Sequence, residues 1–136
     1  MPYSTFPARF EFLDEIRDFV AQAARAGGFS EKVIYSLQLA ADEAASNIIE
    51  HAYAGVADAS LRVSCDMQDD EIVITMHDTG ISFDPSRVKQ PNLQADLSER
   101  QIGGLGVYLM RKLMDDVRYE SDSKTGNVLT MTKRRG

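Results

Sequence analysis

The hydrophobic period changes near residue 60, and this change restricts the fold more than any other feature of the sequence. Between residues 10 and 52 the apolar side chains recur every three or four positions, which is the spacing of one face of an α-helix. From residue 61 to residue 77 they alternate with polar side chains, which is the period of a half-buried β-strand. We therefore expect helices first and paired strands after them.

Two helices are expected in the first part of the chain. The first begins near Phe10 and ends at the Gly27-Gly28 pair, because glycine readily takes the conformation that terminates a helix. The second begins after Ser30, whose hydroxyl can cap the first turn, and runs to about Ala52.

Strands are expected in the second part. Residues 61–67 and 72–77 form a β-hairpin, and residues 117–121 and 128–133 form two further strands. The residues before the first helix do not show whether they form a strand. If they do, Pro7 would limit that strand to the edge of a sheet. Helices grouped beside antiparallel hairpins predict an α+β fold, a two-layer sandwich.

Length and composition narrow the class of protein. The chain has 136 residues, which fits one domain over 1–136. A net charge of −6 argues against a nucleic-acid-binding surface, which needs clustered lysine and arginine. Cys65 is the only cysteine, so no internal disulfide forms and a reducing compartment is suitable. With no secretory signal and no apolar run near the roughly 20 residues of a membrane span, we expect a cytoplasmic protein without membrane contact.

One face of the second helix carries a polar stripe of Glu43, Asn47 and His51, spaced four residues apart. Carboxylate and amide oxygens one turn apart can hold Mg²⁺ directly or through its waters. A carboxylate there can also take a proton from a hydroxyl that attacks a phosphate. Taken alone, the stripe fits an ordinary exposed helix face better than a site.

Two glycine-containing segments point to a nucleotide. Asp78 follows a strand and can accept a hydrogen bond from an exocyclic amine such as that of adenine, and Gly80 allows the backbone to approach the ring. Residues 103–106 (Gly-Gly-Leu-Gly) open a helix, where exposed backbone N–H groups bind anions. Taken singly, the first is also an ordinary turn and the second a hinge or helix cap. Neither the dinucleotide fingerprint nor the phosphate-loop pattern is present.

Together these segments resemble the nucleotide-binding boxes of the histidine-kinase-like ATPases, the GHKL superfamily. Residues 42–53 resemble the N box, and more narrowly that of the bacterial anti-sigma factor serine-protein kinases. Residues 78–85 and 104–110 resemble the first and second glycine boxes, and residues 126–133 resemble the last strand. The resemblance covers nearly the whole chain and implies a mixed, mostly antiparallel sheet with helices on one face.

The resemblance also implies roles for the polar stripe and the first glycine box. Glu43 is then the general base that activates the substrate hydroxyl, and Asn47 is the Mg²⁺ ligand. Asp78 binds the adenine amino group, with Gly80 beside the ring. His51 is typical of the subfamily and receives only a supporting role.

The phosphates are assigned by the same resemblance to the start of the third helix and to a lid. The lid is the segment at about 85–102, from which Arg100 reaches a phosphate, although two extra residues separate Arg100 from Gly104. Gly104 and Gly106 then lie along the phosphates, and the neighbouring cofactor-binding residues are Gly103, Leu105 and Val107. Asn127 stands where some relatives carry a threonine that helps hold the adenine, and it is a polar substitute.

The function implied is that of a Mg²⁺-ATP-dependent serine/threonine protein kinase. Its substrate is an anti-anti-sigma (antagonist) protein, and it also binds a sigma factor and so acts as an anti-sigma factor. The cofactors are ATP and Mg²⁺, the oligomer is a homodimer, and no direct nucleic-acid binding is expected. The alternative is a non-catalytic ATP-binding module for partner switching, which would not require Glu43.

Overall fold

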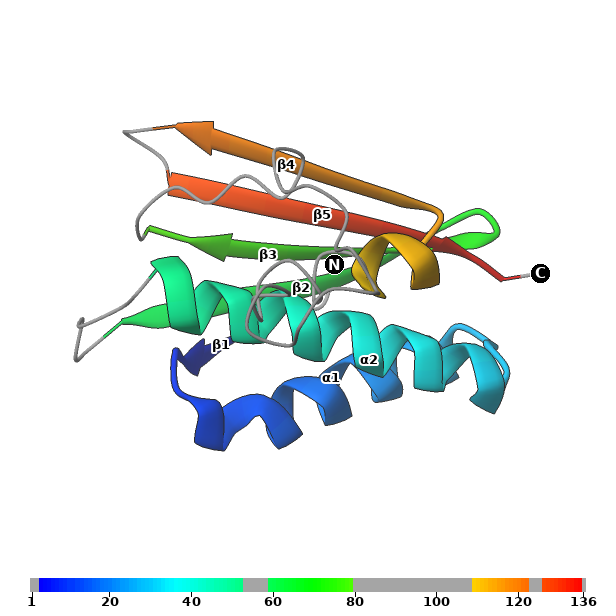
Figure 1. The fold of residues 1–136 in the computed structure, drawn as a ribbon. Helices are drawn as coiled ribbons and strands as arrows, with labels where there is room; N and C mark the ends of the chain where they lie inside the picture. The colour runs from blue at the N-terminus through cyan, green and yellow to red at the C-terminus, as the bar shows by residue number, and fades with distance from the viewer. Residues whose placement is uncertain (1–2, 53–58, 80–108, 123–125, 136) are drawn as a thin grey trace, which may run out of the picture.

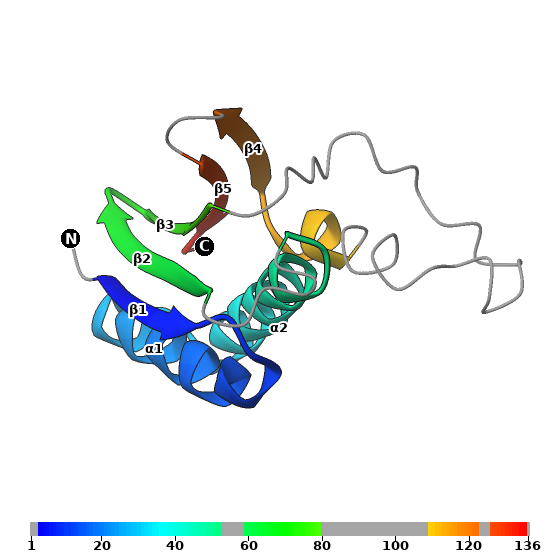
Figure 2. The ribbon, with the colours of Figure 1, turned by 90° about the vertical axis from the view of Figure 1, so that its left-hand side faces the viewer.

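The computed structural model describes residues 3–52, 59–79, 109–122 and 126–135. They form two layers, a β-sheet and a layer of helices that covers one face of it (Figure 1). Figure 2, which looks along the sheet from one end, shows the strands curving around the helices. The α+β two-layer sandwich with helices on one face is therefore confirmed.

The helical layer follows the limits expected from the sequence, with one difference at its end. A 3₁₀ turn, η1 (Phe10–Phe12), leads into α1 (Leu13–Ala26). Gly28 has a φ of +83°, a left-handed conformation that favours glycine and ends α1. The second helix, α2 (Glu31–Asn47), is capped by Ser30 and continues as a π-helix, η2 (Ile48–Ala52). The second predicted helix is thus present to Ala52, but its last turn is wider than an α-helix.

The five strands form one sheet with the order β1-β2-β3-β5-β4. The strands are β1 (Tyr3–Pro7), β2 (Ser60–Gln68), β3 (Glu71–Asp78), β4 (Asp116–Asp122) and β5 (Gly126–Arg134). Every pairing among these described strands is antiparallel, so the parallel component of the expected mixed sheet is not found in them. The reason is that β5 lies between β3 and β4, which run in the same direction.

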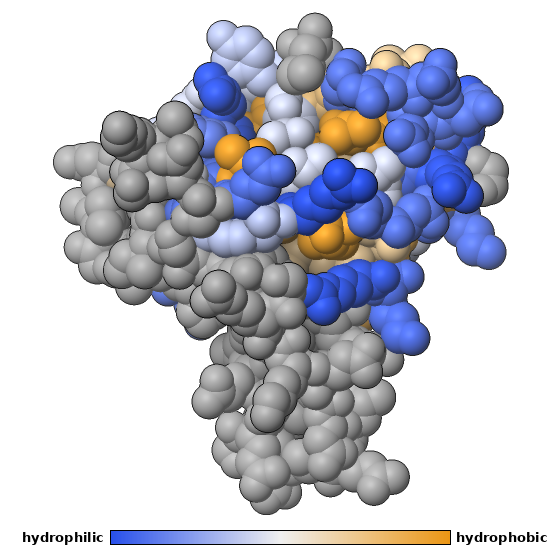
Figure 3. All heavy atoms as spheres, turned by 90° about the horizontal axis from the view of Figure 1, so that it is seen from above, coloured by the Kyte–Doolittle hydropathy of each residue, from blue (hydrophilic) through white to orange (hydrophobic). Residues whose placement is uncertain are grey.

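Both edges of the sheet carry features that discourage pairing with another chain. Pro7 ends β1, whose one neighbour is β2, as the sequence predicted for a strand containing proline. On β4 three described side chains are exposed and charged, Asp116, Arg118 and Glu120, and Arg118 pairs with Asp116 at 2.7 Å. Figure 3, which shows the molecule from above, has mostly hydrophilic side chains on its described part, with apolar ones between them.

The core lies between the helices and the inner face of the sheet. Alternate residues of β2 and β3 are buried there, including Leu61, Ile74 and Met76. From α2 come four alanines with no exposed surface, which let the helix approach its neighbours closely: Ala40, Ala41, Ala44 and Ala45. Among the described residues, no helix is both long and apolar enough to cross a bilayer.

The core cysteine gives a test of this packing. Cys65 is 2% exposed, and burial raises the pKa of its thiol from 9.0 to about 12. Because the thiolate is the reactive form, we expect a thiol reagent at pH 8 to label native protein about 1,000-fold more slowly than unfolded protein. Labelling kinetics with and without denaturant measure this ratio, and equal rates would contradict a closed core around Cys65.

Candidate nucleotide-binding site

Asn47 is the buried polar residue of α2. Its side chain is 4% exposed, and its Nδ2 atom has no hydrogen-bond partner among the described residues. A buried polar atom left unpaired costs about 1–3 kcal/mol, so such a position indicates a group that bonds to something else. Rotation of the amide by 180° exchanges its oxygen and nitrogen, and an amide oxygen is a suitable Mg²⁺ ligand. Asn47 therefore fits the role that the sequence predicted for it.

Glu43 lies one helical turn before Asn47 and is half-buried. Burial raises the pKa of its carboxyl group, and the negative charge of Asp42 raises it further. A carboxylate with a raised pKa binds a proton more readily and is a better general base near neutral pH. This half-buried environment agrees with the proton-accepting role predicted for Glu43.

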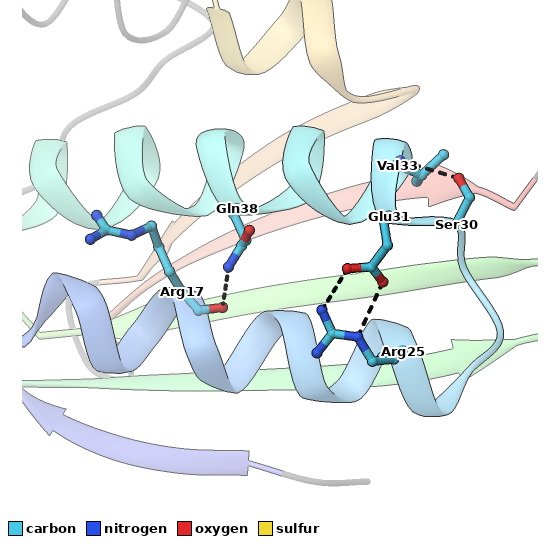
Figure 4. Close-up of polar contacts among 6 residues, drawn as sticks. All are labelled: Arg17, Arg25, Ser30, Glu31, Val33 and Gln38. Atoms are coloured by element: carbon cyan, nitrogen blue, oxygen red, sulfur yellow. Dashed lines mark hydrogen bonds and ion pairs between the residues drawn. The ribbon is translucent and has the colours of Figure 1, made fainter.

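Contacts between α1 and α2 hold the helix that carries Glu43. The Nη1 atom of Arg17 on α1 lies 2.5 Å from Oδ1 of Asp42, and the Arg17 carbonyl accepts a hydrogen bond from Gln38 at 3.3 Å. Near the other end of the helix pair, Arg25 donates two hydrogen bonds to Glu31, at 2.9 and 3.1 Å (Figure 4). Asp42 is thus fixed beside Glu43.

The environment of Glu43 predicts how its replacement affects stability. Its folded-state pKa is raised, so the ionised carboxylate destabilises the folded chain at pH values above that raised pKa. We expect Glu43→Gln to unfold at a higher temperature than the wild type at pH 7. The difference should disappear as the pH falls below about 4.5, where the wild-type carboxyl is protonated in both states.

Thermal unfolding followed by circular dichroism between pH 4 and pH 8 measures this effect. Glu15→Gln on α1 is the matched control, because Glu15 is exposed and the same change there should leave the transition nearly unchanged. A Glu43→Gln variant that is less stable than the wild type at pH 7 would contradict the assigned environment.

A second buried polar group lies where β3 ends and β5 begins. Burial alternates along both strands, and Asp78 and Asn127 continue the inward-facing positions, so both side chains point to the helix side of the sheet. They are 4% and 2% exposed and occupy directly opposed positions. The Asn127 amide nitrogen donates to Oδ1 of Asp78 at 2.8 Å.

Gly126 allows β5 to begin this close to β3. It has a φ of +98°, and a Cβ atom added to it would lie 2.3 Å from the backbone oxygen of Asp78. Both facts require glycine, since real Cβ atoms do not approach so closely. The last turns of α2 and these strand ends lie at the same end of the molecule (Figures 1 and 2).

The structure therefore brings four predicted site residues to one end of the domain: Glu43, Asn47, Asp78 and Asn127. His51 lies in η2. The remaining predicted residues lie outside the described part of the chain and stay predictions: Gly80, Arg100, Gly103, Gly104, Leu105, Gly106 and Val107. The same holds for the lid at about 85–102.

Sequence reasoning did not find two contacts of this site. The bond from Asn127 to Asp78 depends on the register of β3 and β5, which are separated by 47 intervening residues from 79 to 125. The pairing of Arg17 with Asp42 depends on how α1 packs on α2. Neither has a local sequence signal, although the alternation of buried residues indicates that Asp78 faces inward.

Comparison with known proteins identifies the family. Residues 6–133 match the sequence model of one protein family, the histidine kinase-like ATPase domain. The chain is similar to serine-protein kinase RsbW of Listeria innocua, with 33% identity over 128 residues, 91% of this chain and 82% of that protein. It is also similar to serine-protein kinase RsbW of Bacillus licheniformis, with 36% identity over 132 residues, which cover 93% of this chain and 81% of that protein.

Solved structures agree on the fold. The histidine kinase domain of the blue-light activated histidine kinase of Erythrobacter litoralis superposes with a TM-score of 0.57 and 14% identity, over 96% of this chain and 62% of that chain. A longer structure of that kinase matches 79% of this chain at the same TM-score, and the chain spans 32% of its length. The family-model match and the sequence identities show that the chain belongs to the histidine kinase-like ATPase family, with the RsbW serine-protein kinases among its relatives.

Proposed function

We propose that this chain is a Mg²⁺-ATP-dependent protein kinase that phosphorylates a serine or threonine of an anti-anti-sigma protein and, as an anti-sigma factor, also binds a sigma factor. One observation carries the proposal. This chain is similar to serine-protein kinases, and in it the half-buried Glu43 lies one helical turn before the buried Asn47. A proton acceptor beside a metal-binding amide is the pair that phosphoryl transfer from Mg²⁺-ATP to a hydroxyl requires.

The nucleotide occupies the end of the domain where α2, β3 and β5 meet. Asp78 accepts a hydrogen bond from the adenine amine, Gly80 lies beside the ring, and Asn127 contributes to the same end of the pocket. Arg100 reaches a phosphate from the lid at about 85–102. Backbone N–H groups of the second glycine box bind the phosphates, through Gly103, Gly104, Leu105, Gly106 and Val107.

The transfer itself uses two residues of α2. Glu43 takes the proton of the substrate hydroxyl while the hydroxyl oxygen forms a bond to the γ-phosphorus. The bond from that phosphorus to its bridging oxygen breaks, so the products are the phosphorylated antagonist and ADP. Asn47 would hold Mg²⁺ through its amide oxygen, and the chemistry that the ion would supply there is neutralisation of the phosphate charge.

The transfer changes which partner the kinase holds. A phosphate adds about 1.5 to 2 negative charges at pH 7 to the antagonist, which breaks its complex with the kinase. The freed kinase then sequesters the sigma factor. In this proposal the kinase acts in the cytoplasm as a homodimer, and residues 1–136 form one domain of each chain.

Size-exclusion chromatography with the antagonist from the same genome tests the proposal. We expect a complex of kinase and antagonist that dissociates after ATP and Mg²⁺ are added, together with phosphate on a serine or threonine of the antagonist. A stable complex with an unmodified antagonist would favour the non-catalytic partner-switching module instead.

A further inference from the structure

We propose that Asn127 is a positioning residue that fixes the carboxylate of Asp78 and thereby gives the site its preference for adenine over guanine nucleotides. This inference rests on the proposed function, because it assigns a nucleotide base to Asp78. It adds a role for a residue that touches Asp78 in the structure and that sequence reasoning had assigned to the nucleotide alone.

The geometry of the pair supports a positioning role. Asp78 and Asn127 are opposite one another in the register of β3 and β5, and both are almost completely buried. The 2.8 Å bond joins an amide hydrogen of Asn127 to one named oxygen, Oδ1, of Asp78. Because both side chains are short and start from paired strands, this bond restricts rotation of the carboxylate.

The backbone around the pair is built for close approach. Gly126, the residue before Asn127, lies against both Asp78 and Thr79. A Cβ atom added to it would lie 2.3 Å from the Asp78 backbone oxygen and 3.2 Å from Cγ2 of Thr79. The first residues of β5 are therefore held against the last residue of β3. Asn127 reaches Asp78 directly because of this contact.

The chemistry of the pair explains a preference for adenine. A carboxylate has about four lone-pair sites, so a bond from Asn127 leaves it able to accept a further hydrogen bond. Adenine presents an amine, a donor, at the position where guanine presents a carbonyl oxygen, an acceptor. A carboxylate fixed with an accepting oxygen toward the base therefore favours adenine over guanine. Without the hydrogen bond from Asn127, the carboxylate of Asp78 loses a contact that fixes its orientation, and its oxygens are less well aligned to accept from adenine.

The test compares the affinities of the full chain for Mg²⁺-ATP and Mg²⁺-GTP by isothermal titration calorimetry. In Asn127→Leu, which keeps the volume and removes the donor, we expect the ratio of the two affinities to fall by roughly 10- to 150-fold, the effect of a hydrogen bond to a charged group. Asn127→Thr keeps a donor on a residue suited to strands and should recover part of the ratio. Thr130→Val is the control, because Thr130 is on the same strand but faces away from the helices.

Each result decides the inference. An unchanged ratio in Asn127→Leu, or an equal loss of both affinities, would overturn it. If Asn127→Leu does not fold, as circular dichroism would show, Asn127→Thr and Asn127→Ser are compared, and a ratio equal to that of the wild type in both would overturn it. Failure of the wild type to bind ATP would instead refute the proposed function, so the two failures are distinguishable.

Discussion

Replacement of Glu43 by glutamine is expected to slow phosphoryl transfer to the antagonist by roughly 10²- to 10⁴-fold, the usual contribution of a general base. Glutamine has nearly the same shape but does not accept the hydroxyl proton. Glu43 is half-buried, and its raised pKa reflects that burial and the neighbouring Asp42, so its proton affinity is a property of this position. ATP affinity should be nearly unchanged, because the proposed role of Glu43 is to act on the protein substrate and not on the nucleotide.

Single-turnover transfer and a separate nucleotide titration measure the two quantities for Glu43→Gln. Glu31→Gln is the matched control, because Glu31 is at the exposed start of the same helix and bonds Arg25 on the surface. It should transfer phosphate at the wild-type rate. Equal transfer by Glu43→Gln and the wild type would remove Glu43 from the mechanism.

Replacement of Asp78 by asparagine is the second large expected effect. It should weaken ATP binding by roughly 10- to 150-fold, because in the proposed function the Asp78 carboxylate accepts a hydrogen bond from the adenine amine. Asparagine is close in size, and the position is 4% exposed, so the loss reports chemistry more than packing. Calorimetric titration with Mg²⁺-ATP measures it.

The control for that change is Asp66→Asn on β2. Asp66 faces the side of the sheet away from the helices and bonds Gln68. Its replacement should leave ATP affinity at the wild-type value. If the Asp78→Asn variant binds ATP as tightly as the Asp66→Asn variant does, Asp78 does not bind the adenine amine.

Much of the fold could be predicted because its signals are local. The helical spacing after Phe10, the cap at Ser30 and the alternation on both sides of the Asp69-Asp70 turn each depend on a few neighbouring residues. The edge position of Pro7 follows from its missing N–H group. These elements were found at or near their expected limits.

The remainder depends on contacts between distant parts of the chain. Alternating residues show that 128–133 is a strand, but not that β5 lies between β3 and β4. The π-helical turn after Asn47 has no propensity signal in the sequence. The contact from Asn127 to Asp78 arises only when the register of β3 and β5 is known.

The candidate site divides in the same way. Glu43, Asn47 and Asp78 could be proposed as site residues only when their spacing was combined with the resemblance to the nucleotide-binding boxes, because a helix repeat and a strand end alone also fit ordinary surface positions. The environment that makes them suitable could not be found, since the burial of Asn47 and the charge of Asp42 beside Glu43 follow from tertiary packing.

The most direct test of the kinase assignment is transfer of labelled γ-phosphate from ATP to the antagonist in the presence of Mg²⁺, with the modified residue identified by tandem mass spectrometry. We predict label on one serine or threonine with the wild type, and loss of nearly all label with Glu43→Gln. An antagonist that binds the chain and ATP but acquires no label would contradict the assignment.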